Sequence, residues 1–155
     1  MVLDFRFWVS ALTTDNQQPT TQQINPLFTP IKDDIKLGIE ELIINAIEHG
    51  NLSITYNEKS SALQNNSFEK LIQSRINKRE NKNKKVHIIF HQEQTFDEWY
   101  IEDEGNGFDP CEIPSLSKAF EINRLHGRGI LINRFHFDEI EYCNNGRSVR
   151  VRKYV

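Results

Sequence analysis

Three polar residues, Glu41, Asn45 and His49, are spaced four apart in an apolar-rich stretch of the chain. Four residues make slightly more than one helical turn, so these side chains would stack along one line of a helix. The amide oxygen of Asn45 is a suitable ligand for Mg²⁺, and the Glu41 carboxylate, one turn away, could accept a proton from a hydroxyl. On spacing alone, a solvated polar helix edge is the simpler interpretation.

Two glycine-rich loops are the other candidates for binding chemistry. Asp103-Glu-Gly105-Asn-Gly107 follows an expected strand. Its glycines let the backbone approach a ligand, and its carboxylate could accept a hydrogen bond from a purine amino group. His126-Gly-Arg128-Gly-Ile opens an expected helix, where free amides and a guanidinium favour a phosphate. Each loop alone is a weak signal, because a strand-ending turn or close helix–sheet packing would use the same glycines.

The line formed by Glu41, Asn45 and His49 requires a helix, which we expect over residues 33–49. Asp33 or Asp34 would begin it and Gly50 would end it. A second stripe on this helix is apolar and should pack on a sheet; it consists of Ile35, Ile39, Leu42, Ile43, Ala46 and Ile47.

The other elements follow from alternating strand patterns and turn signals. A second long helix is expected over 127–137, and Asn145-Gly146 predicts a tight hairpin. Strands are expected over residues 3–12, 86–91, 99–103, 139–143 and 149–155. This order predicts an α+β, two-layer sandwich with helices on one face of a mixed, mostly antiparallel sheet.

The length of 155 residues suits a single domain over residues 1–155. Residues 52–85 form an irregular polar insertion in this interpretation, with a short helix over 68–76 and a solvated basic run over 78–85. Residues 13–30 are expected to form a loop.

Bulk properties exclude several classes of function. The net charge of −3 and the pI near 6.0 argue against a nucleic-acid binder. No apolar run approaches the roughly 20 residues that span a bilayer, so no membrane association is expected. Cys111 and Cys143 have no metal-like spacing, and free thiols in the cytoplasm are the expected state.

Together and in this order, the motifs resemble those of the GHKL ATPases, which share the histidine kinase-like ATPase fold. Residues 41–51, ELIINAIEHGN, are similar to the N box of that superfamily. Residues 103–108 are similar to its first glycine box, and residues 127–131 to its second. The resemblance covers roughly residues 33–155. It is closest to the anti-sigma serine kinases, because of the HGN after the helix, the short lid between the glycine boxes and the pattern over 137–154.

This resemblance implies binding of ATP and Mg²⁺. Asn45 would coordinate the metal, Asp103 would accept a hydrogen bond from the adenine amino group, and Glu41 would be the general base. The resemblance assigns the nucleotide to Asn45, His49, Asp103, Gly105, Gly107, Gly127, Arg128, Gly129, Ile130 and Ser148. Ser148 matches a position near the adenine where the family often has Thr.

The implied activity is a cytoplasmic serine/threonine protein kinase. Its partners would be an antagonist protein that carries the target Ser or Thr and a sigma factor or related regulator. An ATP-dependent binding module without phosphoryl transfer is one alternative, and the catalytic domain of a sensor histidine kinase is another. The oligomeric state stays open, a homodimer included.

Overall fold

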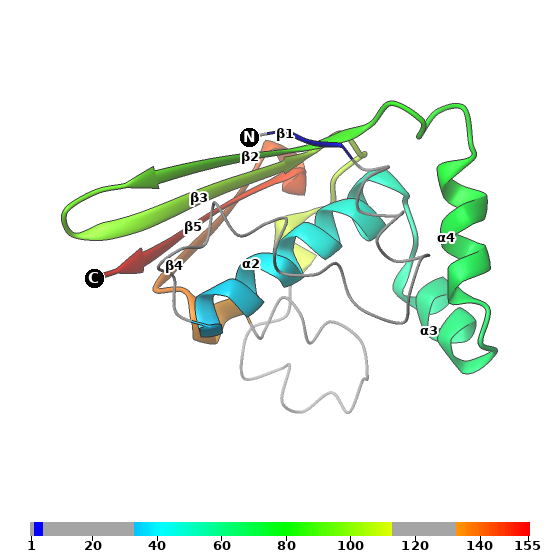
Figure 1. Cartoon of the computed structure of the whole chain (residues 1–155), viewed down its shortest axis with the longest axis horizontal. Coiled ribbons are helices and arrows are strands. Elements are labelled where there is room, and N and C mark those ends of the chain that lie inside the picture. Colours follow the sequence, from blue (N-terminus) through cyan, green and yellow to red (C-terminus); the bar gives the residue numbers. More distant parts are fainter. Residues whose placement is uncertain (1, 5–32, 113–132) are drawn as a thin grey trace.

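The computed structural model describes residues 2–4, 33–112 and 133–155, which form an antiparallel sheet with a helix across one face (Figure 1). The sheet has five strands in the order β1-β2-β3-β5-β4, and every pairing is antiparallel. The strands are β1 (Val2–Asp4), β2 (Lys85–Gln92), β3 (Phe96–Asp103), β4 (Glu139–Cys143) and β5 (Ser148–Tyr154). The predicted α+β class and mainly antiparallel sheet are confirmed, while the described strands include no parallel pair.

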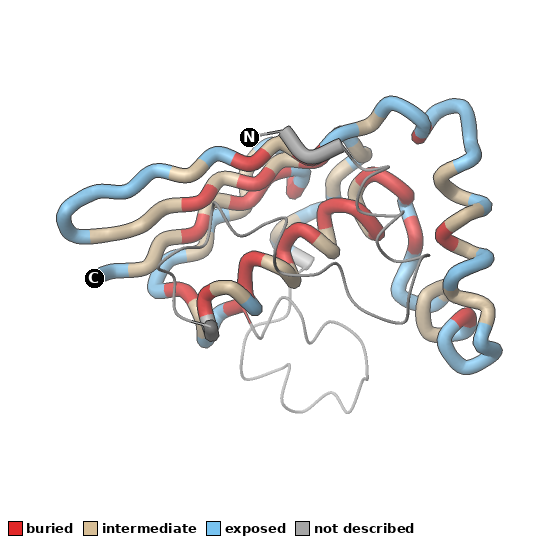
Figure 2. The backbone as a smooth tube through the Cα atoms, in the orientation of Figure 1, coloured by how far each residue is buried: buried red, intermediate tan, exposed pale blue. Residues whose placement is uncertain are grey.

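Helix α2 (Asp33–Asn45) covers the sheet with its apolar stripe. All six residues of the predicted stripe, which extends into the turn after α2, are buried. Figure 2 shows this buried stripe along the helix, against the buried centre of the strands. We call the covered side of the sheet the inner face; it carries Val86, Ile88, Trp99, Ile101, Val149 and Val151. The two-layer arrangement follows from this burial, because side chains alternate along each strand and only one face is apolar.

The chain leaves α2 through a π-helical turn, η2 (Ala46–Asn51). The Leu52 amide donates to the carbonyl of Ile47, five residues back, at 2.9 Å. Gly50 was expected to end the helix, but the described glycines with positive φ are Gly107 and Gly146. Gly50 is therefore not a left-handed cap, and its missing side chain has another use at the site.

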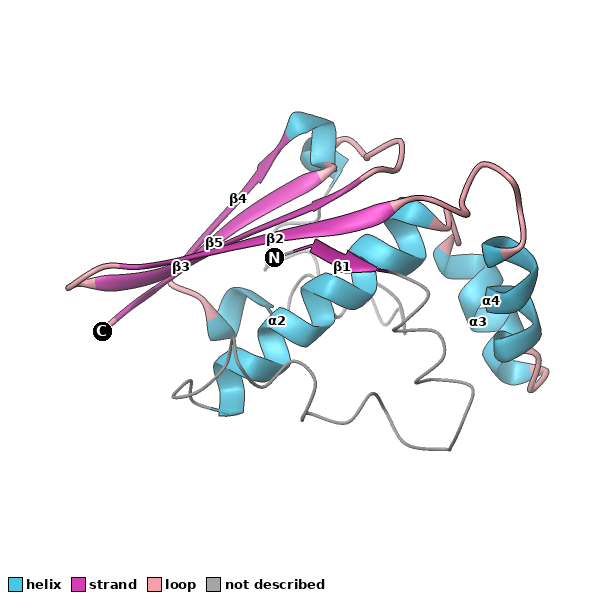
Figure 3. Ribbon diagram, turned by 45° about the horizontal axis from the view of Figure 1, so that its top comes forward, coloured by secondary structure: helices cyan, strands magenta, loops and turns pink. Residues whose placement is uncertain are grey.

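The insertion is more regular than predicted. It contains α3 (Tyr56–Gln64) and α4 (Phe68–Ile76), of which only α4 was expected. Helix α3 begins with a capping box between Thr55 and Glu58, whose side chains each bond the other residue's backbone amide. This Thr-x-x-Glu pattern is a sequence signal for the start of a helix, so α3 is predictable from the sequence. Both helices stand beyond one end of the sheet (Figure 3), and Ile72 of α4 joins the main core.

The hairpin predicted at Asn145-Gly146 is confirmed. Asn144, Asn145 and Gly146 have φ values of 51°, 55° and 76°, which form the short turn η4 (Asn144–Gly146) between β4 and β5. Of the predicted helix over 127–137, residues 133–136 are helical and 127–132 lie outside the described residues. Residues 5–12 of the predicted first strand also lie outside them.

Two bulk predictions can be compared with the structure. Cys111 and Cys143 are both free thiols, as expected. Across the described parts of the chain, none of the helices has the length and apolar character needed to cross a membrane.

Candidate functional site

The end of the first helix meets the first glycine loop at a corner made by Gly50, Asp103 and Gly105. A Cβ added to Gly50 would overlap the Asp103 carboxylate, and one added to Gly105 would overlap the Gly50 carbonyl. The glycines at both positions thus allow the loop backbone to contact the helix directly. The structure brings the predicted N box and first glycine box together.

Asn51 holds this corner together through hydrogen bonds. Its side chain is 1% exposed; Nδ2 donates to the Lys85 carbonyl at 3.0 Å, and Oδ1 accepts from the Glu104 amide at 2.8 Å. The Lys84 ammonium donates to the Asn51 carbonyl at 3.0 Å. One buried amide therefore connects the π-helical turn to the start of β2 and the end of β3. The resemblance did not assign this role, although Asn51 stands within the N-box motif.

Asp103 lies at the end of β3 and is 7% exposed. Its Oδ1 accepts a hydrogen bond from the Gly105 amide at 2.7 Å. Burial raises the pKa of this carboxyl to about 6, although the Gly105 hydrogen bond and the charge of Arg147 act in the opposite direction. A carboxylate that is costly to ionise in a buried corner is a marker of functional sites.

The predicted line of polar residues is kept only in part. Glu41 and Asn45 are both partly exposed and lie one turn apart on α2. His49 falls within the π-helical turn, which shifts it from strict four-residue stacking. Its Nδ1 lies 2.5 Å from the Ile54 carbonyl, and burial lowers the pKa of the ring, while the charge of Glu41 tends to raise it.

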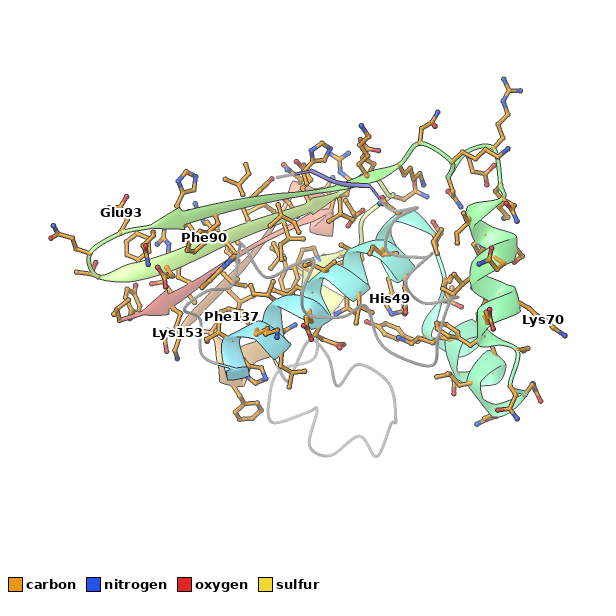
Figure 4. The ribbon with its side chains drawn as sticks, in the orientation of Figure 1. His49, Lys70, Phe90, Glu93, Phe137 and Lys153 are labelled. Atoms are coloured by element: carbon orange, nitrogen blue, oxygen red, sulfur yellow. The ribbon has the colours of Figure 1, made fainter. Side chains whose placement is uncertain are left out.

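His49 also connects the site to α3. Its ring lies 4.2 Å from the ring of Tyr56, at the first residue of α3, and Figure 4 shows His49 between α2 and that helix. The next contact is an ion pair between Lys59 and Glu48, 2.5 Å long, in which the Glu48 side chain is 4% exposed. Sequence reasoning missed both contacts, because a polar insertion gives no sign of which residues fold back.

The far end of the glycine loop is attached to the β4–β5 turn. The Phe108 amide donates to the Asn145 carbonyl at 2.9 Å. Gly107 has φ 73°, and a Cβ there would overlap the same carbonyl, so glycine is required on two counts. The loop is therefore held at both ends, by Asn51 at one end and by η4 at the other.

Ser148 is not brought to the same face as Asp103. The β3–β5 register pairs Ser148 with Glu102, whereas Asp103 follows Trp99 and Ile101 on the inner face. The Ser148 hydroxyl is buried without a hydrogen-bond partner among the described residues. Arg147, whose carbonyl accepts from the Asp103 amide at 2.9 Å, is the β5-side residue beside Asp103.

The second glycine box, with Gly127, Arg128, Gly129 and Ile130, lies outside the described residues. Within the described ranges, no group of three or more His, Cys, Asp or Glu side chains is arranged to hold a metal. An open depression of about 470 Å³ lies elsewhere, between α3 and α4, and its lining includes Glu58, Ser61, Asn65, Lys70, Leu71 and Ser74. It does not include the predicted site residues.

Comparisons with known proteins identified no relative of this chain. A scan against protein-family models found no match, and searches of curated proteins and of solved structures found no similar protein. The GHKL resemblance therefore stays a prediction from the motifs.

Proposed function

We propose that the corner between η2 and the glycine loop is one wall of a Mg-ATP site. The observation that carries the proposal is the contact among Gly50, Asp103 and Gly105. Two motifs separated by about a third of the chain meet through close contacts that only glycine permits. A packing role alone would not require a buried carboxylate at the point of contact.

The carboxylate of Asp103 supplies the base recognition in this proposal. Oδ1 is occupied by the Gly105 amide, and Oδ2 accepts no hydrogen bond from any described residue. An ionised oxygen in a buried corner is suited to an exocyclic amino group, because both lone pairs accept hydrogen bonds. Adenine carries an exocyclic amino group at C6, where guanine carries a carbonyl oxygen.

Glu41 and Asn45, one turn apart on α2, supply the groups for phosphoryl transfer in this proposal. Asn45 would provide a neutral oxygen to Mg²⁺, and Glu41 would take the proton from the attacking hydroxyl of a protein substrate. The partner in this proposal is an antagonist protein with a target Ser or Thr, whose modification regulates a sigma factor or a related partner. The ordered motifs support this assignment, as does the position of Asn45 immediately before the turn that carries Gly50.

A second function, an ATP-dependent binding switch, is favoured by the contacts to α3. His49 and Glu48 belong to the turn that forms the corner, and they contact Tyr56 and Lys59. A ligand that moved this turn would thus move α3. This function would use the same nucleotide site without phosphoryl transfer.

Base selectivity tests the proposal. Calorimetric titration with Mg-ATP and Mg-GTP should show a preference for ATP of roughly tenfold or more, because a carbonyl facing the carboxylate leaves both groups unpaired. Asp103→Asn should reduce ATP affinity by roughly 10–100-fold, the cost of a lost charged hydrogen bond. Equal binding of both nucleotides by the wild-type protein would refute the role of Asp103.

A further inference from the structure

The hydroxyl of Tyr142, on β4, is a polar group that the proposed function does not yet use. Its oxygen is buried and has no hydrogen-bond partner among the described residues. A buried hydroxyl without a partner is unfavourable, so natural structures usually pair it with a protein group, water or a ligand. A ligand group is therefore a candidate partner for this hydroxyl.

The register places Tyr142 on the inner face, the face that carries α2. Tyr142 pairs with Val149, which in turn pairs with Ile101 across the next strand. The Tyr142 ring meets that of Phe108 edge-on, with the centroids 5.4 Å apart. Because Phe108 ends the glycine loop, Tyr142 borders the proposed nucleotide site.

The position of Tyr142 in the sheet indicates which part of a nucleotide would lie there. Asp103, which would recognise the base, ends β3, whereas Tyr142 lies on β4, two strands away across β5. Neighbouring strands lie about 5 Å apart, so Tyr142 is roughly 10 Å across the inner face from the base, on the side where the phosphates would extend. Burial raises the pKa of Tyr142 to about 12, although the charge of Arg134 acts in the opposite direction. A phenol that stays protonated is suited to donate to an anionic oxygen.

We infer that the Tyr142 hydroxyl donates a hydrogen bond to the phosphate groups of the bound nucleotide. The inference rests on the proposed function, because it needs the nucleotide to occupy the corner. It adds a phosphate-binding residue from β4, a strand to which the motif resemblance assigns no role. The edge-on contact with Phe108 orients the ring.

The substitution Tyr142→Phe tests this inference, because it removes the hydroxyl and keeps the ring against Phe108. Calorimetric titration should show roughly tenfold weaker binding of Mg-ADP, while adenosine binds as tightly as to the wild-type protein. The melting temperature without nucleotide should be unchanged or higher, since the hydroxyl has no partner to lose. Tyr154→Phe, on an exposed β5 residue whose hydroxyl donates to Glu139, is the matched control and should leave both affinities unchanged.

The possible results separate the two claims. If the wild-type protein binds neither ADP nor adenosine, the proposed function fails and the inference falls with it. If the wild-type protein binds ADP and Tyr142→Phe binds it equally well, the inference is wrong and the nucleotide site stands. Equal weakening of ADP and adenosine would place the hydroxyl at the nucleoside and contradict the phosphate assignment.

Discussion

At the scale of single residues, the proposed site depends on two carboxylates in different surroundings. Asp103 is buried against Gly50, and its pKa is raised. Glu41 is partly exposed on α2. The buried carboxyl is suited to base recognition and the more exposed one to proton transfer, so each role can be tested by its own variant.

Replacement of Glu41 by alanine should remove the general base. Phosphorylation of the partner should fall about 10²–10⁴-fold, while the affinity for Mg-ATP stays close to that of the wild-type protein. Radiolabelled phosphoryl transfer and calorimetry measure the two effects. Glu40→Ala, at the next position on the same helix, is the matched control. Unimpaired transfer by the Glu41→Ala protein would exclude Glu41 as the base.

The raised pKa of Asp103 predicts opposite pH effects on binding and on stability. Nucleotide binding needs the ionised carboxylate, so affinity should fall by up to about tenfold per pH unit below the pKa of about 6. The folded protein holds this proton more tightly than the unfolded chain, whose pKa is near 3.8. The stability that Asp103 contributes is thus full below about pH 4 and is lost as the pH rises through about 6.

Titrations across this pH range should be repeated with Asp103→Asn. The residual binding of that variant supplies the baseline for ionisation of the nucleotide itself. If Asp103 is the titrating group, the affinity of the wild-type protein depends on pH in a way that the affinity of the variant does not. Parallel profiles for the two proteins would show that another group is responsible.

At the scale of elements, the sequence predicts periodic features well and close contacts poorly. The stripe from Ile35 to Ile47, the four described C-terminal strands and the Asn145-Gly146 hairpin all follow from local patterns, and each is confirmed. The π-helical turn does not follow from such a pattern, because one extra residue per turn depends on what packs beside it.

The side-chain contacts of the candidate site show the same division. The sequence motifs identified Asp103 and Gly105 as site residues. They did not predict the hydrogen bond from the Glu104 amide to Asn51 or the contact between the rings of Tyr56 and His49. The alternation of side chains along β5 places Ser148 and Val149 on opposite faces of the sheet. Only the register, which pairs Ser148 with Glu102, shows that Ser148 is not on the face of Asp103. Contacts across long sequence separations need coordinates.

The close approach of the glycine loop to η2 predicts a sharp effect of one methyl group. Gly105→Ala places a Cβ against the Gly50 carbonyl and should lower the free energy of unfolding by about 1–3 kcal/mol, as overpacking does. Urea denaturation measures the change. Asn106→Ala, at the exposed position between the two glycines, should differ from the wild-type protein by less than about 0.5 kcal/mol. Equal stability of both variants would argue against the contact.

The ion pair between Lys59 and Glu48 ties α3 to the site. Lys59→Met leaves the buried Glu48 carboxylate without this partner and should lower the free energy of unfolding by about 1–3 kcal/mol, less than for a fully buried pair because Lys59 is partly exposed. Lys70→Met, on an exposed α4 residue, is the control for removing one positive charge. An unchanged denaturation midpoint for Lys59→Met would mean that α3 is held by other contacts.

At the scale of the whole molecule, one sheet face carries both the core and the site. The core runs along α2 and η2, from Phe137 beside Gly38 of α2 to Asp103 beside Gly50 of η2. A ligand at the corner would therefore contact groups that belong to the cooperative core. Binding there should stabilise the whole fold and not only a loop.

Thermal unfolding with and without Mg-ATP is the most direct test of this claim. At a nucleotide concentration of about 100 times the dissociation constant, the protein should gain roughly 2.7 kcal/mol. For a chain of this size, that gain raises the melting temperature by roughly 5–10 °C. Asp103→Asn should lose most of the increase at the same concentration. A wild-type melting temperature that does not change at millimolar Mg-ATP would contradict the nucleotide site.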